Sequence, residues 1–332
     1  MATDAYAVTE GPLTGATPAA VLALLAEATR RDGVAPVSEQ GLLALRHRSP
    51  GVRHLWVAHG PEVLGYAQVD DGGSAELVVH PDHRRRGVGR RLLEALRPTA
   101  NGGPAVGTED AADAAGDSAG PAVWAHGDLP GARALARAAG LEVTRELWFM
   151  ALDLPAPDAP LDPGPGERAE RAAPDGVGLR TFVPGEDEAA WVALNARAFA
   201  DHPEQGRLTV DDVRAREEEP WFDPAMLWLA HESGDPARLL ASMWVKVVPG
   251  EDEGEIYAVG VDPAAQGRGL GRWLTAVALD AMTHRGLRRA TLYVEGDNAV
   301  ARRTYERAGF RRAGVDVQYR WGHGARDATM GP

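Results

Sequence analysis

Cysteine is absent from the sequence, and lysine occurs only once, at Lys246, although lysine and arginine together number 35. Without cysteine the chain can form neither disulfide bonds nor a catalytic thiolate. Long apolar runs are also absent, so no segment is predicted to span a membrane, and the first residues lack the basic and apolar parts of a secretion signal. We therefore expect a cytoplasmic protein.

Positively charged residues are also fewer than negatively charged ones, 35 against 48. The formal net charge is −13, which disfavours non-specific binding to nucleic acid. The hydrophobic content of 44% and the charged content of 25% are ordinary for a globular protein. A length of 332 residues is enough for about two domains. We expect a two-domain monomer that binds neither nucleic acid nor membranes.

The two halves of the sequence repeat one pattern. Setting Gly87 on Gly269 brings a valine, a proline, a second glycine and a leucine into register: Val79, Pro81, Gly89 and Leu92 with Val261, Pro263, Gly271 and Leu274. A further match aligns two more pairs of segments: 124–128 with 293–297, and 138–141 with 307–310. An internal repeat of this kind indicates duplicated structural units. The sequence therefore predicts two copies of one α/β domain.

Two segments stand apart from the repeat by their composition. Residues 98–120 are rich in Ala, Gly, Asp and Pro, and residues 155–177 begin with a run rich in proline. Segments of this composition cannot bury a hydrophobic core. We predict a flexible insert in the first domain and a linker between the domains, which places the domains at 1–154 and 178–332.

Each copy is predicted to open with a helix and a pair of strands. Apolar residues at helical spacing predict helices over 18–30 and 186–200. Short apolar runs predict a strand pair in each copy: 55–58 with 63–69, and 227–230 with 239–245. The strand pair then leads into the repeated glycine-rich segment.

In the second copy a glycine-rich turn lies between a strand and a helix. The strand over 255–261 ends at Asp262-Pro263, because proline cannot continue a strand ladder. The turn 266–271 follows and leads into the helical run 273–279. Bare backbone N–H groups at a helix N-terminus suit a phosphate or pyrophosphate, and glycines allow positive φ and a close approach. The turn matches neither the dinucleotide-binding fingerprint nor the P-loop.

The pattern Gln/Arg-x-x-Gly-x-Gly after a strand ending in Val-Asp-Pro, with Asn298 and Tyr305 further on, resembles the acetyl-CoA site of the GCN5-related N-acetyltransferases, the GNAT superfamily. The resemblance implies two tandem domains, each a mixed, mostly antiparallel twisted sheet flanked by helices. It also implies acetyl-CoA as co-substrate and no metal. The closing signature, an Asn followed by a helix with Tyr and then Gly309-Phe310, strengthens it.

In that family the thioester and pantetheine lie along the strand before the turn, the pyrophosphate lies on the turn, and the segment after the asparagine contacts the CoA arm. The resemblance therefore implies these acetyl-CoA contacts in the second copy: Val259, Gly260, Val261, Gln266, Gly267, Arg268, Gly269, Leu270, Gly271, Arg272, Asn298, Ala299, Val300, Ala301, Arg302 and Arg303.

Acetyl transfer to an amine requires a neutral amine, a polarised thioester carbonyl and a proton for the leaving thiolate. A free α-amino group has a pKa of about 7.7–8.0, so modest help from a base is enough. Glu255 opens the strand before the turn and could accept this proton directly or through a water molecule. Tyr305 is the candidate acid, because the family's tyrosine hydroxyl meets the CoA sulfur.

The first copy lacks this acid. Leu129 and Ala136 stand at the positions that match Asn298 and Tyr305. The glycine turn itself is retained, so the first copy could hold acetyl-CoA without turning it over, through Leu77, Val78, Val79, Arg85, Arg86, Gly87, Val88, Gly89 and Arg90. We predict a catalytic second domain and a degenerate first domain.

The tandem arrangement and several polar loops resemble the GNAT enzymes that acetylate the cysteinyl amine of 1D-myo-inositol 2-(L-cysteinylamino)-2-deoxy-glucopyranoside. The resemblance implies five substrate-binding residues: Glu39, Glu204, Lys246, Glu255 and Tyr293. Carboxylates and neutral hydrogen-bonding groups suit a cationic amine on a polyhydroxylated sugar. If Glu39 touches the substrate, the first half closes over the active site of the second.

Two other functions stay open at this stage. The same turn and tyrosine would serve an acetyltransferase for peptide N-termini or for another amino sugar. A non-catalytic acetyl-CoA-binding regulator is the alternative that the first copy alone would suggest, and Asn298 and Tyr305 argue against it.

Overall fold

The computed structural model describes residues 6–47, 51–97, 120–155, 173–200 and 205–322. Residues 98–119 of the predicted insert and 156–172 of the predicted linker lie outside these ranges, and Glu204 lies outside them too. Within the described ranges, no helix combines the length and the apolar character needed to cross a bilayer.

The chain divides into two compact units. Unit 1 comprises residues 1–147 with 314–332, and unit 2 comprises residues 148–313. The sequence had suggested domains over 1–154 and 178–332, with the whole C-terminal segment in the second. Strand β12 (Arg311–Trp321) makes the difference, because it pairs antiparallel with β5 (Ala122–Ala125) in unit 1. The internal repeat carries no signal for this long-range pairing.

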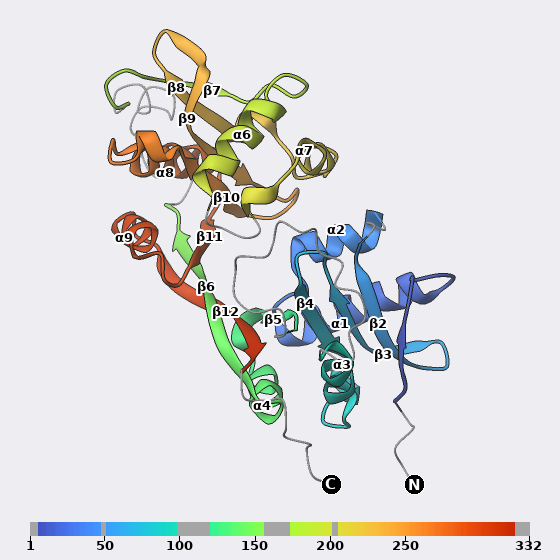
Figure 1. The fold of residues 1–332 in the computed structure, drawn as a ribbon. Coiled ribbons are helices and arrows are strands. Elements are labelled where there is room, and N and C mark those ends of the chain that lie inside the picture. Colours follow the sequence, from blue (N-terminus) through green and yellow to red (C-terminus); the bar gives the residue numbers. More distant parts are fainter. Residues whose placement is uncertain (1–5, 48–50, 98–119, 156–172, 201–204, 323–332) are drawn as a thin grey trace. The chain divides into compact units, whose positions relative to one another are not determined.

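Unit 1 is a mixed sheet with helices on both faces (Figure 1). Its strand order is β1-β2-β3-β4-β5-β12-β6, with bounds β1 (Val8–Glu10), β2 (Arg53–His59), β3 (Glu62–Val69), β4 (Ser74–Val79) and β6 (Leu141–Asp153). The neighbours from β1 to β4 are antiparallel, and β4 and β5 are parallel. One core lies under α1 (Thr17–Asp32) and α2 (Glu39–His47), and another lies under α3 (Val88–Leu96) and α4 (Pro130–Ala138).

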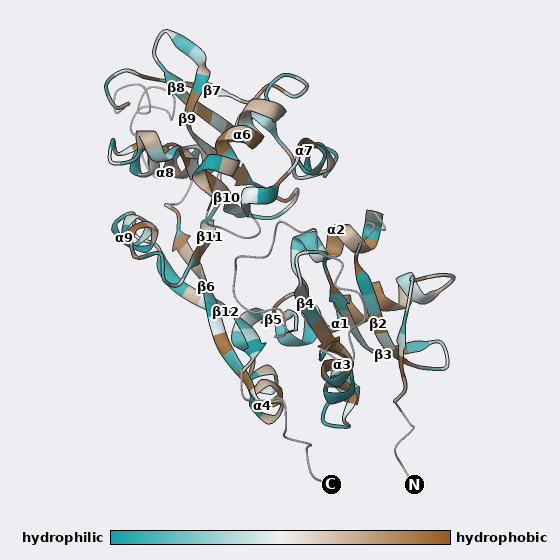
Figure 2. Ribbon diagram, viewed as in Figure 1, coloured by the Kyte–Doolittle hydropathy of each residue, from teal (hydrophilic) through white to brown (hydrophobic). Residues whose placement is uncertain are grey.

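Unit 2 has a closely similar plan. Its strand order is β6-β11-β10-β9-β8-β7, with bounds β7 (Val177–Thr181), β8 (Leu227–Glu232), β9 (Asp235–Lys246), β10 (Glu253–Val261) and β11 (Arg289–Glu295). Strands β7 to β10 are antiparallel, and β10 and β11 are parallel. An aromatic core lies under α6 (Glu188–Ala198) and α7 (Val210–Glu217), and an aliphatic core lies under α8 (Leu270–His284) and α9 (Ala299–Arg307). The β8–β9 turn is hydrophilic (Figure 2).

The repeat predicted from sequence is confirmed by the backbone. The short helix η1 (Pro81–His83) corresponds to η6 (Pro263–Ala265). The residues that precede them, His80 and Asp262, have φ/ψ of −49°/129° and −51°/129°. They end at Arg84 and Gln266, with φ/ψ of −66°/158° and −62°/157°. The predicted opening helices and strands are also present, each within a few residues of its expected bounds. Both copies therefore carry the same strand–turn–helix segment at the same place in the sheet.

Candidate functional site

The glycine turn of unit 2 has the conformation that its sequence predicts. Gly267 and Gly269 both have φ of 80°, in the region that favours glycine, and Gly269 caps the N-terminus of α8. Buried Leu270 anchors the first turn of this helix in the core. The first backbone N–H groups of α8 have no partner within the helix, so the turn presents donors at the positive end of a helix dipole. This arrangement suits a phosphate-bearing ligand.

Strand β10, which leads into the turn, changes its pairing along its length. It pairs with β11 from Glu253 to Ile256, while its pairing with β9 continues to Val261. Beyond Ile256 the edge of β10 that faces β11 therefore offers backbone groups to an extended ligand. Gly260 lies in this stretch, and a side chain there would approach the Cβ of Ala198 to 3.1 Å. The predicted contacts Val259, Gly260 and Val261 thus lie on an open strand edge.

A β-bulge interrupts β10 just before this edge. Ile256 lies opposite Val245 and Ala258 lies opposite Trp244, so the register shifts by one residue at Tyr257. A bulge bends its strand and re-aims the neighbouring side chains, and bulges are common beside active sites. Sequence reasoning missed this feature, because an extra residue inside an apolar strand leaves no local signal.

The predicted base and the only lysine are cross-strand neighbours. Glu255 lies directly opposite Lys246 of β9, one residue pair before the pair Ile256–Val245 that adjoins the bulge. On its other side Glu255 pairs with buried Thr291 of β11. Side chains directly opposite each other project from the same face of a sheet. The structure therefore brings a carboxylate and an ammonium together within unit 2.

The predicted acid lies on α9. The Tyr305 side chain is 6% exposed and packs edge-on against Phe310, with ring centroids 5.8 Å apart. Burial raises the pKa of the Tyr305 hydroxyl, so it stays protonated at neutral pH, as a general acid must. Asn298 is the N-cap of this helix, where its side chain accepts a hydrogen bond from the Ala301 amide at 3.0 Å.

Two other predicted contacts have local partners. Arg302 donates a hydrogen bond to the Gly296 carbonyl, and its guanidinium lies 4.2 Å from the ring centroid of Trp148. Tyr293 is 44% exposed, and its ring centroid lies 5.1 Å from that of Phe149. The remaining predicted substrate contact in the described chain, Glu39, is the first residue of α2 in unit 1.

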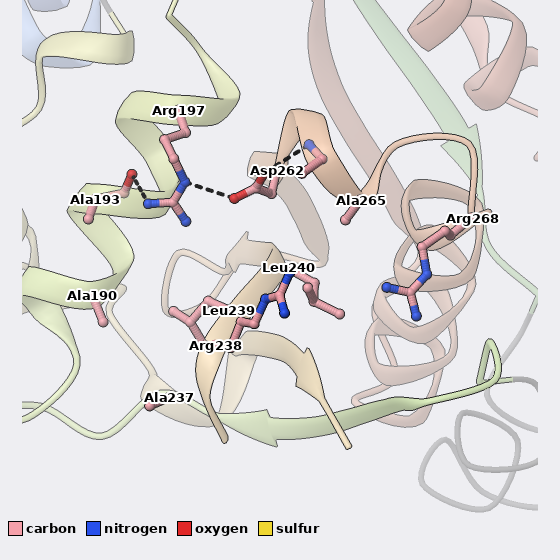
Figure 3. Close-up of a pocket in the computed structure, with 11 residues that line it drawn as sticks. Ala190, Ala193, Arg197, Ala237, Arg238, Leu239, Leu240, Asp262, Ala265 and Arg268 are labelled. Atoms are coloured by element: carbon pink, nitrogen blue, oxygen red, sulfur yellow. Dashed lines mark hydrogen bonds and ion pairs between the residues drawn. The ribbon is translucent and has the colours of Figure 1, made fainter. Parts of the chain in front are cut away.

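A pocket of about 270 Å³ adjoins the glycine turn of unit 2 (Figure 3). Residues from α6, the start of β9 and η6 line it, and Arg268 contributes from the turn itself. On its wall Arg197 donates to the carboxylate of Asp262 at 2.8 Å. Neither Glu255 nor Tyr305 lines the pocket, so it is separate from the residues predicted to carry out the chemistry.

The glycine turn of unit 1 has the same backbone with different residues. Arg85 has φ of 62° where unit 2 has Gly267, and Gly87 has φ of 91°. Arg84, which matches Gln266, makes two hydrogen bonds to Asp32, at 2.7 and 2.6 Å. The predicted unit 1 contacts around Gly87 therefore sit on a turn whose backbone can still approach a phosphate.

Strand β4 of unit 1 differs from β10 because it carries a buried ionic cluster instead of a bulge. Its register with β3 is continuous from Gly65–Val79 to Val69–Ala75. Buried Glu76 accepts hydrogen bonds from Gln68 at 2.8 Å and from His126 at 2.9 Å. The other nitrogen of His126 donates to Asp316 of β12 at 2.9 Å.

Charge in this cluster is set by competing effects. Burial opposes the charged form of His126, but hydrogen bonds to Asp316 and Glu76 outweigh it and raise the pKa of His126 to about 10. Burial likewise opposes the charge of Glu76, and the hydrogen bond from His126 outweighs it and lowers the pKa of Glu76. At neutral pH the cluster therefore holds a cationic imidazole between two carboxylates.

Glu62, His80 and His83 bring three potential metal ligands together in the described part of unit 1. However, Nδ1 of His80 accepts a hydrogen bond from the Asp82 amide at 3.3 Å. Nδ1 is then unprotonated, and in the neutral ring Nε2 carries the proton and faces the Glu62 carboxylate, 3.9 Å away. The arrangement favours a polar contact over metal ligation.

Two acetyltransferase sequence models match the chain. The acetyltransferase (GNAT) family matches residues 191–310, and an acetyltransferase (GNAT) domain matches residues 51–115. A tandem GNAT protein from the clavulanic acid biosynthesis pathway has a similar structure, with a TM-score of 0.63, 20% identity and coverage of 95% of this chain and 98% of that one. A GCN5-related N-acetyltransferase from Sphaerobacter thermophilus also has a similar structure, with a TM-score of 0.60 and 24% identity. The match covers 94% of this chain and 95% of that one. The fold is that of a tandem GNAT acetyltransferase.

Curated relatives narrow this class. The mycothiol acetyltransferase of Cellulomonas flavigena is 50% identical over 329 residues, covering 92% of this chain and 87% of that protein. The mycothiol acetyltransferase of Beutenbergia cavernae is 51% identical over 308 residues, covering 90% of this chain and 94% of that protein. The chain belongs to the mycothiol acetyltransferase family.

Proposed function

We propose that the chain transfers the acetyl group of acetyl-CoA to the cysteinyl amine of cysteinyl-glucosaminyl-inositol, the last step of mycothiol biosynthesis. The observation that carries this proposal is the identity of about half of all residues with mycothiol acetyltransferases along nearly the whole chain. The cross-strand pairing of Glu255 with Lys246 near the bulge supports it. The substrate carries an amine, whose proton Glu255 can take, and neighbouring oxygen atoms, to which Lys246 can donate hydrogen bonds.

Acetyl-CoA would bind along the open edge of β10 and on the turn before α8. The pantetheine would form backbone hydrogen bonds with Val259–Val261, as an added strand does at a sheet edge. The pyrophosphate would accept hydrogen bonds from the turn 266–272. The segment 298–303 would flank the CoA arm, and Arg302 would contact CoA while one of its N–H groups holds the loop through the Gly296 carbonyl.

The reaction would use two residues of unit 2. Glu255 accepts a proton from the cysteinyl ammonium, and the neutral nitrogen attacks the thioester carbonyl carbon. The C–N bond forms as the C–S bond breaks, the attacking nitrogen releases its second proton to solvent, and Tyr305 donates its hydroxyl proton to the leaving CoA thiolate. Proton exchange with solvent restores both groups. The chemistry asks little of the base, because the free α-amine has a pKa of about 7.7–8.0.

Unit 1 would retain acetyl-CoA binding but not catalysis. Its turn has the same backbone conformation as the turn of unit 2. Ala136 occupies the position of Tyr305, so no hydroxyl is present for the leaving thiolate. Calorimetry with acetyl-CoA is expected to give two sites for each chain, and one of them should vanish when Gly87 is replaced by valine.

The acceptor would be recognised by Lys246, Glu255, Tyr293 and Glu39, with Glu204 as a further contact outside the described residues. The exposed ring of Tyr293 can stack on a sugar and donate its hydroxyl. The carboxylates would bind the cationic amine before its proton is removed.

A turnover assay tests this proposal. Formation of the acetylated product should be followed by mass spectrometry, because the acceptor carries its own thiol and would react with thiol reagents. The acceptor should be compared with des-cysteinyl glucosaminyl-inositol and with peptides bearing N-terminal cysteine. We expect turnover of the cysteinyl compound alone. Turnover confined to peptides would contradict the named substrate and leave the acetyltransferase fold in place.

A further inference from the structure

The bulge in β10 places Tyr257 on a particular face of the unit 2 sheet. Ile256, before the bulge, packs in the core under α8, whereas Tyr257 and Ala258 both pack in the aromatic core on the α6 side. An unbroken strand would send two consecutive side chains to opposite faces. The bulge therefore adds an aromatic ring next to Trp244, on the face that also carries Glu255 and Lys246.

Tyr257 is held from several sides within this face. Its ring centroid lies 5.2 Å from those of both Trp221 and Trp244. Its hydroxyl accepts a hydrogen bond from Nε of Arg216 at 2.8 Å. Arg216 is buried on α7, and its Nη1 donates to the Asp212 carbonyl at 2.8 Å. The ring of Tyr257 is thus fixed in orientation as well as in position.

The ammonium of Lys246 lies over two of these rings. The Nζ atom lies 4.9 Å from the centroid of Trp221 and 5.6 Å from that of Tyr257. Both distances are within the range of a cation–π interaction, which requires the charged form of the amine. A compact ammonium suits this position better than a broad guanidinium, which would stack on one ring. This gives a physical reason for a single lysine in a chain that otherwise uses arginine.

We propose that Trp221, Tyr257 and Arg216 are positioning residues for the acceptor, because they hold the Lys246 ammonium at one place beside Glu255. The proposal rests on the proposed function. With the charge fixed there, the cationic amine of the acceptor is repelled from Lys246 and attracted to Glu255, while the carbonyl and hydroxyl oxygens of the acceptor face the ammonium. The pair then orients the acceptor before the proton is removed. We call these three residues the lysine platform.

Steady-state kinetics test this role by comparing the change in KM for the acceptor with the change in KM for acetyl-CoA. Trp221→Leu removes one ring, and it should raise KM for the acceptor roughly 5–30-fold while KM for acetyl-CoA changes less than about 2-fold. Trp221→Phe keeps an aromatic face and should restore most of the affinity. Trp191→Leu is the matched control, because Trp191 belongs to the same core and packs edge-on against Trp244. An unchanged acceptor KM in Trp221→Leu, or an equal rise in Trp191→Leu, would overturn the proposal.

The single lysine allows a second measurement that does not need turnover. Reductive methylation of the full chain with ¹³C-formaldehyde labels only Lys246 and the N-terminal amine, and methylation keeps the charge. The Lys246 methyl resonance should be shifted upfield by the two rings and should return to its ordinary position in Trp221→Leu. A resonance at the ordinary position in the unsubstituted chain would overturn the platform. If the named acceptor is not turned over, the proposed function fails, and this resonance still decides whether the platform exists.

Discussion

The two units share one backbone plan and differ at one position of the central strand. In unit 2, the strand before the glycine turn has an extra residue, Tyr257, and its neighbours Glu255 and Lys246 share a partly exposed face. In unit 1, the register of β4 is continuous, and Glu76 occupies the equivalent stretch in a buried cluster with His126. The polar pair of unit 2 is therefore partly exposed, whereas Glu76 and His126 of unit 1 lie in a buried cluster.

The start of helix α2 covers the buried polar cluster of unit 1. The Ser38 amide donates to Glu76 at 2.7 Å, and a side chain at Gly41 would clash with the amide of Gln68. Backbone at the start of α2 thus packs directly on the polar groups of β3 and β4. Unit 1 therefore has Ala136 at the position of the proposed acid, and its start of α2 covers the polar groups of β3 and β4.

The largest expected effect comes from removing the proposed acid, Tyr305, which has no counterpart in unit 1. Tyr305→Phe removes the hydroxyl and keeps the ring in its contact with Phe310. We expect kcat to fall roughly 10²–10⁴-fold, with little change in stability. The measurement is steady-state turnover of the cysteinyl acceptor. Tyr319→Phe, a tyrosine of unit 1, serves as the control and should retain full activity; comparable losses in both variants would contradict the role of Tyr305.

Breaking the ionic cluster should affect stability. His126→Gln leaves two buried carboxylates without their cation, which should lower the free energy of unfolding of unit 1 by about 3–5 kcal/mol. Chemical denaturation monitored by tryptophan fluorescence measures this change. His54→Gln removes a half-buried histidine of the same sheet and should cost much less.

The same cluster predicts a pH dependence. The pKa of His126 is about 10 in the folded state and about 6.5 in the unfolded chain, so the folded state holds the proton more tightly. Its stabilisation is complete below about pH 6.5 and declines as the pH rises toward 10. The difference in unfolding free energy between the unsubstituted chain and His126→Gln should therefore shrink from pH 6.5 to pH 10. A constant difference would show that the charge of His126 is not what stabilises unit 1.

Removing the base should have a smaller effect than removing the acid. Glu255→Gln should lower kcat roughly 10²-fold at neutral pH, and activity should recover partly at high pH, where the acceptor amine is already neutral. Glu253→Gln is the matched control on the same strand, since Glu253 is near Arg289 at 3.5 Å and away from the bulge. A loss that does not diminish with rising pH would argue against a role in proton removal.

The smallest effect concerns the turn residue that differs between the units. Gly267→Arg places a side chain at φ of 80° and should destabilise unit 2 by about 1–2 kcal/mol and weaken acetyl-CoA binding. Arg85→Gly, the reverse change at φ of 62°, should alter the stability of unit 1 by less than about 1 kcal/mol. Thermal unfolding with and without acetyl-CoA measures both. Equal destabilisation by the two changes would contradict the backbone equivalence of the turns.

Local sequence determined the strand–turn–helix segments, because proline ends a strand, glycine permits positive φ and helical spacing buries Leu270 and Leu274. The duplication was visible in the internal repeat, and the GNAT class in the resemblance of the motifs to that family. The candidate residues Glu255 and Tyr305 were also identified from the sequence, since each lies within or just after a recognisable segment.

Tertiary structure decided which distant residues meet. His126 and Asp316 are separated by 190 residues, and β12 belongs to unit 1 through its pairing with β5. The bulge at Tyr257 and the placement of Lys246 between two rings depend on the register of β9 and β10 and on the packing of α7. Strand register and side-chain packing are long-range properties, and a one-residue shift reverses the face of every side chain, so local patterns do not encode them. The sequence thus determined which side chains each copy carries, and the fold determined which of them meet.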